Sequence, residues 1–325
     1  GGEALASMAT LPHPLALRSL PVLLPDLARD AWRAIAHGSL DRIYRRAPMV
    51  RFDDTSRIVL FSDSHRGDNS RADAFRANAS LFDQALLHYY TEGFTYVEVG
   101  DGDELWQNRR FTTVRRAHPR TFDLLDRFHG DGRLHMLLGN HDIQGLNRRR
   151  MAKGHLIAQE ALVLQHARTG QRLFVTHGHQ ADATADQMHV ISRLLVRRVW
   201  KRLLLAGVKD VHRPAPPEPR APGLWDRIME WLRAEFVDRL VEWAEANERV
   251  LICGHTHRPA LAQVGAAPYF NTGNCVDPGV ITGLEIQHGA ISQVRWVARS
   301  EADVDGVQRI ERQVLAPPRP LRLYP

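Results

Sequence analysis

Five short hydrophilic clusters carry most of the residues in this chain that could do chemistry. In chain order they are Asp63-Ser64-His65, Gly100-Asp101, Gly139-Asn140-His141-Asp142, Thr176-His177-Gly178-His179 and Gly254-His255-Thr256-His257. Carboxylate, imidazole and amide oxygen together bind first-row divalent metals well. A thiolate site is excluded, because the chain has only 2 cysteines and no CxxC pair. The clusters therefore predict a metal centre with nitrogen and oxygen ligands.

The number of candidate ligands points to more than one ion. The candidates are Asp63, His65, Asp101, Asn140, His177, His255 and His257. They are too many for one tetrahedral zinc, whereas two ions about 3.5–4 Å apart can share them around one bridging carboxylate. In an Asp-x-His pair both side chains lie on the same side of an extended segment, so both can reach one ion. Glycines before Asp101, Asn140 and His255 allow tight turns beside the ions.

Each cluster follows an apolar run that predicts a buried strand. The runs are residues 57–61, 95–99, 134–138, 173–176 and 250–253, and further strands are predicted over 162–166, 281–286 and 291–297. Helices are predicted over 24–46, with a break at Gly38 and Ser39, and over 71–90 and 121–128. Alternating strands and helices indicate a layered α/β fold with mixed sheets. The clusters would then converge at the carboxyl edge of the strands, where such folds bind ligands.

One region interrupts this alternation. Residues 184–247 give no strand signal, and two helices are predicted there, over 187–207 and 224–247, around a proline-rich connector at 212–223. We expect a helical cap inserted into a core fold. The predicted organisation is an N-terminal segment and helix (1–50), a core (51–183 and 248–300), the cap (184–247) and a C-terminal tail (301–325).

The series D-x-H, G-D, G-N-H-D, H-G-H and G-H-T-H resembles the calcineurin-like metallophosphoesterase superfamily. All five motifs occur in the family's order, and Asn271-Thr272-Gly273-Asn274 resembles the turn that follows G-H-T-H in many bacterial members. The resemblance implies a four-layer α/β/β/α sandwich with a di-metal site. It assigns Asp63, His65 and His257 to one ion, Asn140, His177 and His255 to the other, and Asp101 to the bridge between them.

The resemblance also implies a mechanism. A hydroxide formed on the metals attacks phosphorus in line, and His141 meets the substrate phosphate and can protonate the leaving group. Asp142 would orient His141 by accepting its other N–H. We expect manganese first, because the oxygen-rich ligand set tolerates it, with iron, zinc and cobalt as alternatives. Two further substrate contacts are predicted, Arg66 beside the D-x-H pair and His179 in H-G-H.

Composition limits the partners. The formal net charge of +6 suits anionic partners without choosing among them. No basic and aromatic platform for stacking bases is present, so nucleic acid is not the expected partner, although a nuclease of the same superfamily remains an alternative. The chain has no run of about 18 apolar residues. We expect a cytoplasmic protein, with a peripheral membrane location as the alternative, and a small phosphate monoester or diester as substrate.

Two further readings remain open. A helical insertion between H-G-H and G-H-T-H resembles the lipid A pathway hydrolases that cleave UDP-diacylglucosamine, although these usually carry G-N-R-D and H-G-D instead of G-N-H-D and H-G-H. A lipid-linked substrate would meet the predicted basic face of the cap. That face is formed by Arg193, Arg197, Arg198, Lys201 and Arg202. The second reading is a non-catalytic binding module that has kept the fold, and the complete ligand set argues against it.

Overall fold

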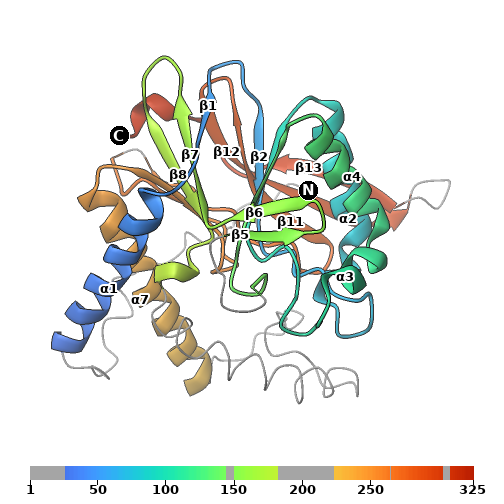
Figure 1. The fold of residues 1–325 in the computed structure, drawn as a ribbon, viewed down its shortest axis with the longest axis horizontal. Coiled ribbons are helices and arrows are strands. Elements are labelled where there is room, and N and C mark those ends of the chain that lie inside the picture. The colour runs from blue at the N-terminus through green and yellow to red at the C-terminus, as the bar shows by residue number, and fades with distance from the viewer. Residues whose placement is uncertain (1–25, 144–149, 182–222, 264, 303–307) are drawn as a thin grey trace, which may run out of the picture.

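Two β-sheets face each other between two layers of helices (Figure 1). The computed structural model describes residues 26–143, 150–181, 223–263, 265–302 and 308–325. Helices α2, α3 and α4 lie outside one sheet, and α1 and α7 lie outside the other. The expected α/β/β/α sandwich of mixed sheets is therefore confirmed.

The larger sheet has nine strands. Its order is β13 (Gln308–Val314), β12 (Ala290–Ala302), β11 (Val280–Gln287), β2 (Ile58–Phe61), β3 (Thr95–Val99), β4 (Leu134–Leu137), β6 (Leu156–Gln159) and β5 (Arg150–Lys153), and β14 (Arg319–Pro320) pairs with β12. Strands β2, β3, β4 and β6 are parallel to one another. The remaining pairs are antiparallel. The three strands that precede predicted ligands are thus adjacent and point the same way.

The smaller sheet has five strands. Its order is β1 (Met49–Phe52), β7 (Ala161–His166), β8 (Arg172–Thr176), β9 (Val250–Cys253) and β10 (Tyr269–Asn271). Only β7 and β8 are antiparallel. Strands β8 and β9, which precede the two histidine-rich clusters, are parallel neighbours.

Strand β2 shows why an unbroken apolar run suits this architecture. All four of its residues are buried. Ile58 and Leu60 pack between the two sheets, and Val59 and Phe61 pack under the outer helices. Because side chains alternate between the faces of a strand, a strand covered on both faces needs apolar residues at every position.

The helices over the larger sheet are η2 (Ala74–Ala77), α2 (Ala79–Thr91), α3 (Phe111–Ala117) and α4 (Pro119–Gly130), and those over the smaller sheet are α1 (Asp26–Tyr44) and α7 (Leu224–Ala246). The predicted break in the first helix is wrong, because α1 continues through Gly38. Ala36, Leu40 and Ile43 form a buried face on both sides of that glycine. This packing outweighs the roughly 1 kcal/mol that glycine costs a helix.

Helix α7 belongs in part to the outer layer of the sandwich. Phe236, Leu240 and Trp243 are buried with residues of α1 and β9, and the Trp243 indole Nε1–H donates to Asp41 Oδ1 over 2.9 Å. The predicted helix 187–207, the proline-rich connector and the basic face lie outside the described residues, so the cap and its boundaries stay a prediction. None of the described helices is long and apolar enough to cross a membrane.

The C-terminal residues do not form a separate tail. Strand β13 pairs with β12, and the short helix η5 (Leu321–Leu323) follows β14. Leu321 and Tyr324 are buried between the sheets, and the Tyr324 hydroxyl donates to the Ala262 carbonyl over 2.8 Å. Two buried side chains, the pairing of β14 with β12 and hydrogen bonds to its backbone together fix this proline-rich stretch to the core.

Candidate metal centre

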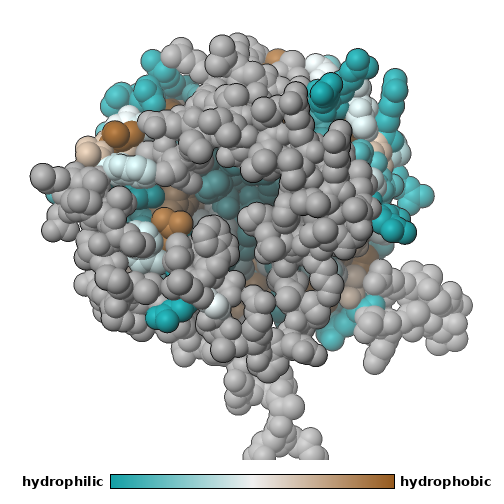
Figure 2. All heavy atoms as spheres, turned by 90° about the horizontal axis from the view of Figure 1, so that it is seen from below, coloured by the Kyte–Doolittle hydropathy of each residue, from teal (hydrophilic) through white to brown (hydrophobic). Residues whose placement is uncertain are grey.

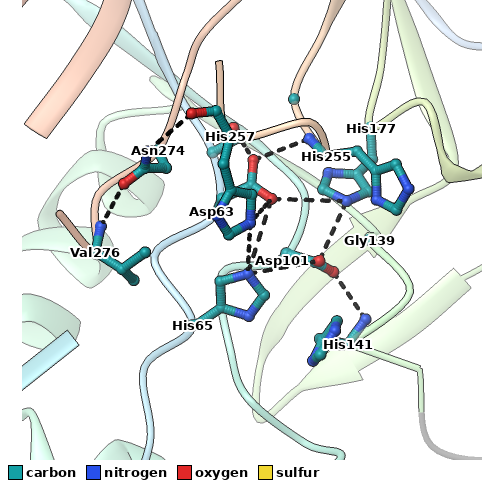
Figure 3. Close-up of polar contacts among 12 residues, drawn as sticks. Asp63, His65, Asp101, Gly139, His141, His177, His255, His257, Asn274 and Val276 are labelled. Carbon is teal, nitrogen blue, oxygen red and sulfur yellow. Dashed lines mark hydrogen bonds and ion pairs between the residues drawn. The ribbon is translucent and has the colours of Figure 1, made fainter. Parts of the chain in front are cut away.

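Five strands bring the predicted ligands to one edge of the sandwich. The clusters directly follow β2, β3 and β4 of the larger sheet and β8 and β9 of the smaller one. Figure 3 shows the side chains from both sheets facing one another, with Asp63 and Asp101 in the middle of the histidines. Seen from below, the described residues at the centre of the molecule are hydrophilic (Figure 2). Clusters that are far apart in the sequence thus form a single site.

The backbone is strained where it presents the ligands. Eight non-glycine residues of the described chain have positive φ, and the ones among the candidate ligands are Asp63, His65, Asp101, His255 and His257. A non-glycine residue in this region costs of order 1 kcal/mol or more, and such residues cluster at functional sites. At these residues the backbone turns after the strand, so that the ligand side chain points towards the shared edge and not into solvent.

Two glycines make room for this crowding. Gly100 has a φ of 83°, and a Cβ there would lie 2.7 Å from the His177 ring. A Cβ on Gly139 would lie 2.0 Å from Asp101 Oδ1. Both positions therefore require glycine so that backbone and ligand side chains can approach closely.

A first group of donor atoms comes from Asp63, His65 and His257. His257 Nε2 lies 3.1 Å from Asp63 Oδ1 and 3.2 Å from His65 Nε2, and the last two atoms are 3.8 Å apart. Two donors bound to one ion at about 2.1 Å lie roughly 3–3.5 Å from each other. These spacings therefore suit a shared cation.

A second group comes from Asp101, His177 and His255. His177 Nε2 lies 3.2 Å from Asp101 Oδ2 and 4.0 Å from Asp63 Oδ1. Asp101 Oδ2 is also 3.8 Å from His65 Nε2, so this carboxylate touches both groups. A third combination, His65, Asp101 and His141, is also close enough to hold an ion.

Neighbouring groups orient the ligand atoms. Asp63 Oδ2 accepts hydrogen bonds from the Ser62 hydroxyl and from the His255 backbone N–H, which leaves Oδ1 for the edge. His177 Nδ1 lies 2.8 Å from the Val99 carbonyl, so Nδ1 keeps its proton and Nε2 is the nitrogen that can offer a lone pair to an ion once its own proton is lost. The Asn271–Asn274 turn holds the G-H-T-H loop, with Asn271 donating to the Gly254 carbonyl and Asn274 to the His257 carbonyl.

Among the candidate ligands of the described structure, three buried atoms have no hydrogen-bond partner: Asp63 Oδ1, Asn140 Oδ1 and His177 Nε2. A buried polar atom left without a partner costs about 1–3 kcal/mol. All three belong to candidate ligands, and all three are lone-pair donors of the kind that divalent cations bind. The residues present therefore fit a divalent-metal centre.

The charges of the site favour added positive charge. Burial alone would raise the pKa of Asp63, but His257 and His177 lower it to about 2. Burial would lower the pKa of His65, but Glu104 and Asp101 raise it to about 10. Asp101 and Asp63 likewise raise the pKa of the buried His177 to about 9. The carboxylates thus hold protons on the histidines where cations could take their place.

His141 is oriented by Glu104 and not by Asp142 as the sequence led us to expect. Its Nδ1 lies 2.8 Å from Glu104 Oε2, and its backbone N–H donates to Asp101 Oδ1 over 2.8 Å. The imidazole is stacked on the Trp106 indole, with ring centroids 4.1 Å apart and planes at 18°. The His141 side chain is 23% exposed, so the fixed ring still has an open side.

Asp142 turns away from this ring into the protein. Its carboxylate accepts from the backbone N–H groups of Gly139 and Asp103 over 2.9 Å each, and from Lys153 Nζ over 2.6 Å. Burial and the negative charges of Asp103 and Asp101 raise its pKa, while Lys153 lowers it. Asp142 therefore ties the loop after β3 to the loop after β4.

Arg66 is buried and paired, and not open to the site as the predicted substrate contact requires. Its guanidinium is fully buried, with two hydrogen bonds to Glu98 of 2.6 and 2.9 Å and one to Asp103 of 2.9 Å. A paired and buried arginine supports the loop instead of contacting a phosphate. His179 begins the short helix η3 (His179–Ala181) and is buried, with its ring centroid 5.5 Å from that of His177. Its contact with substrate stays a prediction.

The sequence did not predict the roles of four residues that shape the site: Ser62, Glu104, Trp106 and Lys153. For Glu104 it predicted hydrogen bonds to neighbouring loops and not the contact with His141. Glu104 and Trp106 lie three and five residues after Asp101. A tryptophan so close to a predicted bridging carboxylate is a signal that indicates a residue beside the site. Ser62 and Lys153 carry no such signal, because a serine in a strand and a lysine near a turn are common.

Comparison with known proteins identifies the family. Residues 56–259 match the family of calcineurin-like phosphoesterases, which covers more than half of the chain. No curated protein matches the chain. Vps29 of Chaetomium thermophilum is 12% identical, with 81% of this chain and 99% of that chain covered and a TM-score of 0.38. Vacuolar Protein Sorting 29 of Cryptosporidium parvum is 13% identical, with 81% and 100% covered and a TM-score of 0.39.

Wild-type Vps29 of Entamoeba histolytica, solved in complex with Zn²⁺, is 16% identical, with 80% of this chain and 99% of that chain covered and a TM-score of 0.37. TM-scores this low carry no argument about fold or function. The family match and the ordered motifs do carry one, because the motifs lie inside the matched residues and meet at one edge of the sandwich. This chain belongs to the calcineurin-like phosphoesterase family.

Proposed function

We propose that this chain hydrolyses phosphate monoesters or diesters with two divalent metal ions at the centre described above. The observation that carries this proposal is two donor groups side by side, with Asp101 Oδ2 of the second group 3.8 Å from His65 Nε2 of the first. One group alone would suit a single structural ion. Two neighbouring groups with a carboxylate between them suit the paired ions that in-line attack at phosphorus uses.

Asp63, His65 and His257 would hold one ion, and Asn140, His177 and His255 the other. The distances of Asp101 Oδ2 to His177 Nε2 and to His65 Nε2, 3.2 and 3.8 Å, support its role as the bridge. Manganese is the first candidate, and iron, zinc and cobalt have compatible ligand preferences. When bound, the ions would supply an activated water and polarise the phosphoryl oxygens.

His141 would act on the substrate directly. Because Glu104 holds Nδ1, the nitrogen left for substrate is Nε2. A proton there can be donated to a phosphoryl oxygen or to the leaving oxygen. The His141 backbone donates to Asp101, so the carboxylate that bridges the ions also fixes the distance between the ions and this imidazole.

A substrate panel tests the proposal. The metal-free chain would be loaded with Mn²⁺ and assayed with p-nitrophenyl phosphate, bis-p-nitrophenyl phosphate, cyclic nucleotides and nucleotide pyrophosphates. We expect hydrolysis of at least one ester, loss of that activity in the chelated protein and recovery when Mn²⁺ is returned. Asp101→Asn is the matched inactive variant, since it keeps the shape of the bridge and removes its charge.

Failure of the loaded protein to hydrolyse any of these compounds above the rate of Asp101→Asn would contradict the proposal and favour a binding module. Turnover of the nucleotide pyrophosphate alone would instead favour the pyrophosphate hydrolases over the ester hydrolases.

A further inference from the structure

We infer that Trp106 is a positioning residue that fixes Asn140 and His141 relative to each other, an inference that rests on the proposed function. Asn140 is a predicted ligand and His141 the predicted proton donor, and they are consecutive in the chain. One indole contacts both: its N–H contacts the first and its ring face contacts the second. Through these two contacts Trp106 would hold the ion-binding side chain of Asn140 and the proton-donating ring of His141 in position to act on the same phosphoryl group.

The first contact fixes a peptide plane. Trp106 Nε1 donates to the Asn140 carbonyl over 2.7 Å. The N–H of the same peptide unit, that of His141, donates to Asp101 Oδ1 over 2.8 Å. Both polar groups of this peptide are thus held from opposite sides. The Asn140 side-chain Oδ1 is left buried and without a hydrogen-bond partner in the described structure, ready for an ion.

The second contact fixes the imidazole. The Trp106 ring lies nearly parallel to the His141 ring, at 18° and 4.1 Å between centroids. The His65 ring meets the same imidazole at 90° and 4.7 Å. With Nδ1 held by Glu104, rotation of the ring would break three contacts at once. The ring is therefore set in one orientation before substrate arrives.

Trp106 is itself well anchored. It is 9% exposed, and its backbone N–H donates to Glu104 Oε1 over 3.0 Å. The other oxygen of that carboxylate receives His141 Nδ1. The Leu105 N–H donates to the His141 carbonyl over 3.1 Å. Side-chain and backbone contacts together thus hold residues 104–106 against residues 140–141.

Two substitutions separate the contacts. Trp106→Phe keeps an aromatic face for His141 and removes the N–H that holds Asn140. Trp106→Leu removes both. Trp296→Phe is the matched control, because Trp296 is 7% exposed and its Nε1 donates to the Tyr89 hydroxyl over 3.0 Å, within a cluster under α2. The control therefore also loses one buried indole hydrogen bond.

We expect Trp106→Phe to bind the weaker of the two Mn²⁺ ions roughly 3–10-fold less tightly, the size of one lost hydrogen bond. Its kcat at saturating Mn²⁺ should stay within about threefold of the wild-type value. Trp106→Leu should show the same loss of affinity, and its kcat should also fall about tenfold or more for an alkyl phosphate. The fall should be smaller for p-nitrophenyl phosphate, which needs little help from a proton donor.

The double variant tests whether Trp106 acts through His141. Trp106→Leu with His141→Ala should be no slower than His141→Ala alone, because residues that act as a unit are not additive. Trp296→Phe should leave the Mn²⁺ affinities and the leaving-group dependence unchanged.

Multiplicative losses in the double variant, or equal losses of Mn²⁺ affinity in Trp106→Phe and Trp296→Phe, would overturn the inference. If the wild-type protein hydrolysed nothing, the proposed function would fail. The comparison of Mn²⁺ affinities between Trp106→Phe and Trp296→Phe would still decide whether Trp106 positions Asn140.

Discussion

His141 is the residue whose fixed position matters most for the proposed chemistry. Its ring nitrogen, ring face and backbone are each held by a different group, from Glu104, Trp106 and Asp101. Preorganisation of this kind matters because a misplaced acid contributes little in the transition state. The same residue is also close enough to His65 and Asp101 to be considered as a ligand. Substitution separates the two roles.

We predict that His141→Ala binds two metal ions normally and loses kcat by about 10²–10⁴-fold, the usual cost of a lost general acid. The loss should be smaller for p-nitrophenolate, a good leaving group, than for an alkoxide. Metal analysis and kinetics on the two leaving groups check this. A missing ion in the variant would make His141 a ligand, and equal losses for both leaving groups would leave it with charge stabilisation alone.

Glu104→Gln should show part of the same defect, with the same dependence on the leaving group. The amide keeps the size of the side chain and loses the carboxylate oxygen that holds the imidazole through Nδ1. Steady-state kinetics on the two esters measure it. Asp142→Asn is the informative comparison, because its carboxylate contacts the loops instead of the ring. A leaving-group dependence in Asp142→Asn but not in Glu104→Gln would contradict the observed orientation.

The sequence predicted where the candidate ligands lie more closely than it predicted the groups that support them, for a physical reason. Asp63, Asp101 and His255 follow apolar runs, and a strand end sets the side-chain position closely. Whether Glu104 or Asp142 faces His141 depends on turns that the residue order does not determine. Arg66 shows the same limit: it lies beside a ligand in the chain, yet its guanidinium is buried against Glu98.

At the scale of elements, the loops after β3 and β4 act as one unit. Asp142 accepts backbone hydrogen bonds from both loops, and Lys153 at the end of β5 neutralises it. Lys153 Nζ also lies 2.8 Å from Asp103, which pairs with Arg66. All of these charges are buried. Removing one partner of a buried ion pair leaves an uncompensated charge and is strongly destabilising.

Lys153→Met should therefore lower the free energy of unfolding by about 3–5 kcal/mol. The double variant with Asp142→Asn should recover part of that loss, because the amide needs no counter-cation. Denaturant unfolding of the metal-free proteins measures both. Arg299→Met is the control, since its ion pair with Glu311 is exposed and such pairs contribute about 0–1 kcal/mol. A similar small loss in Lys153→Met would refute the argument.

Among the elements, strands buried on both faces were predictable, and short strands at or beside a sheet edge were not. Strand β2 is apolar at every position. Strands β1, β5 and β6 have four residues each with mixed polarity, so no periodicity marks them. The range of helix α1 was predicted, but the predicted break at Gly38 was wrong. Packing of the residues on both sides of Gly38 keeps the helix continuous.

Across the whole molecule, two sheets from distant parts of the chain build one charged edge. In the metal-free state, carboxylates raise the pKa of His65 to about 10 and that of His177 to about 9. At neutral pH both imidazoles then carry a proton on each ring nitrogen, and metal ligation requires the loss of one proton from each ring. Protons and metal ions thus compete for the same edge.

Metal binding should accordingly release protons, and the apparent affinity should rise with pH from about 6 to 9. The sign follows from the raised pKa values, because the competing proton is held below pH 9 and leaves above it. Calorimetry of Mn²⁺ binding in buffers of different ionisation enthalpy at pH 7 measures the release. Binding without release, or affinity that falls as pH rises within this window, would contradict the charge distribution.

The central claim is a centre for two ions bridged by Asp101, and metal stoichiometry tests it most directly. The wild-type chain would be saturated with Mn²⁺, separated from free metal and analysed for metal per chain, beside Asp101→Asn. We predict two ions per chain in the wild type and weaker binding of both in the variant, because the bridge serves both ions. One ion or none in the wild type, or two retained ions with full activity in Asp101→Asn, would contradict the account.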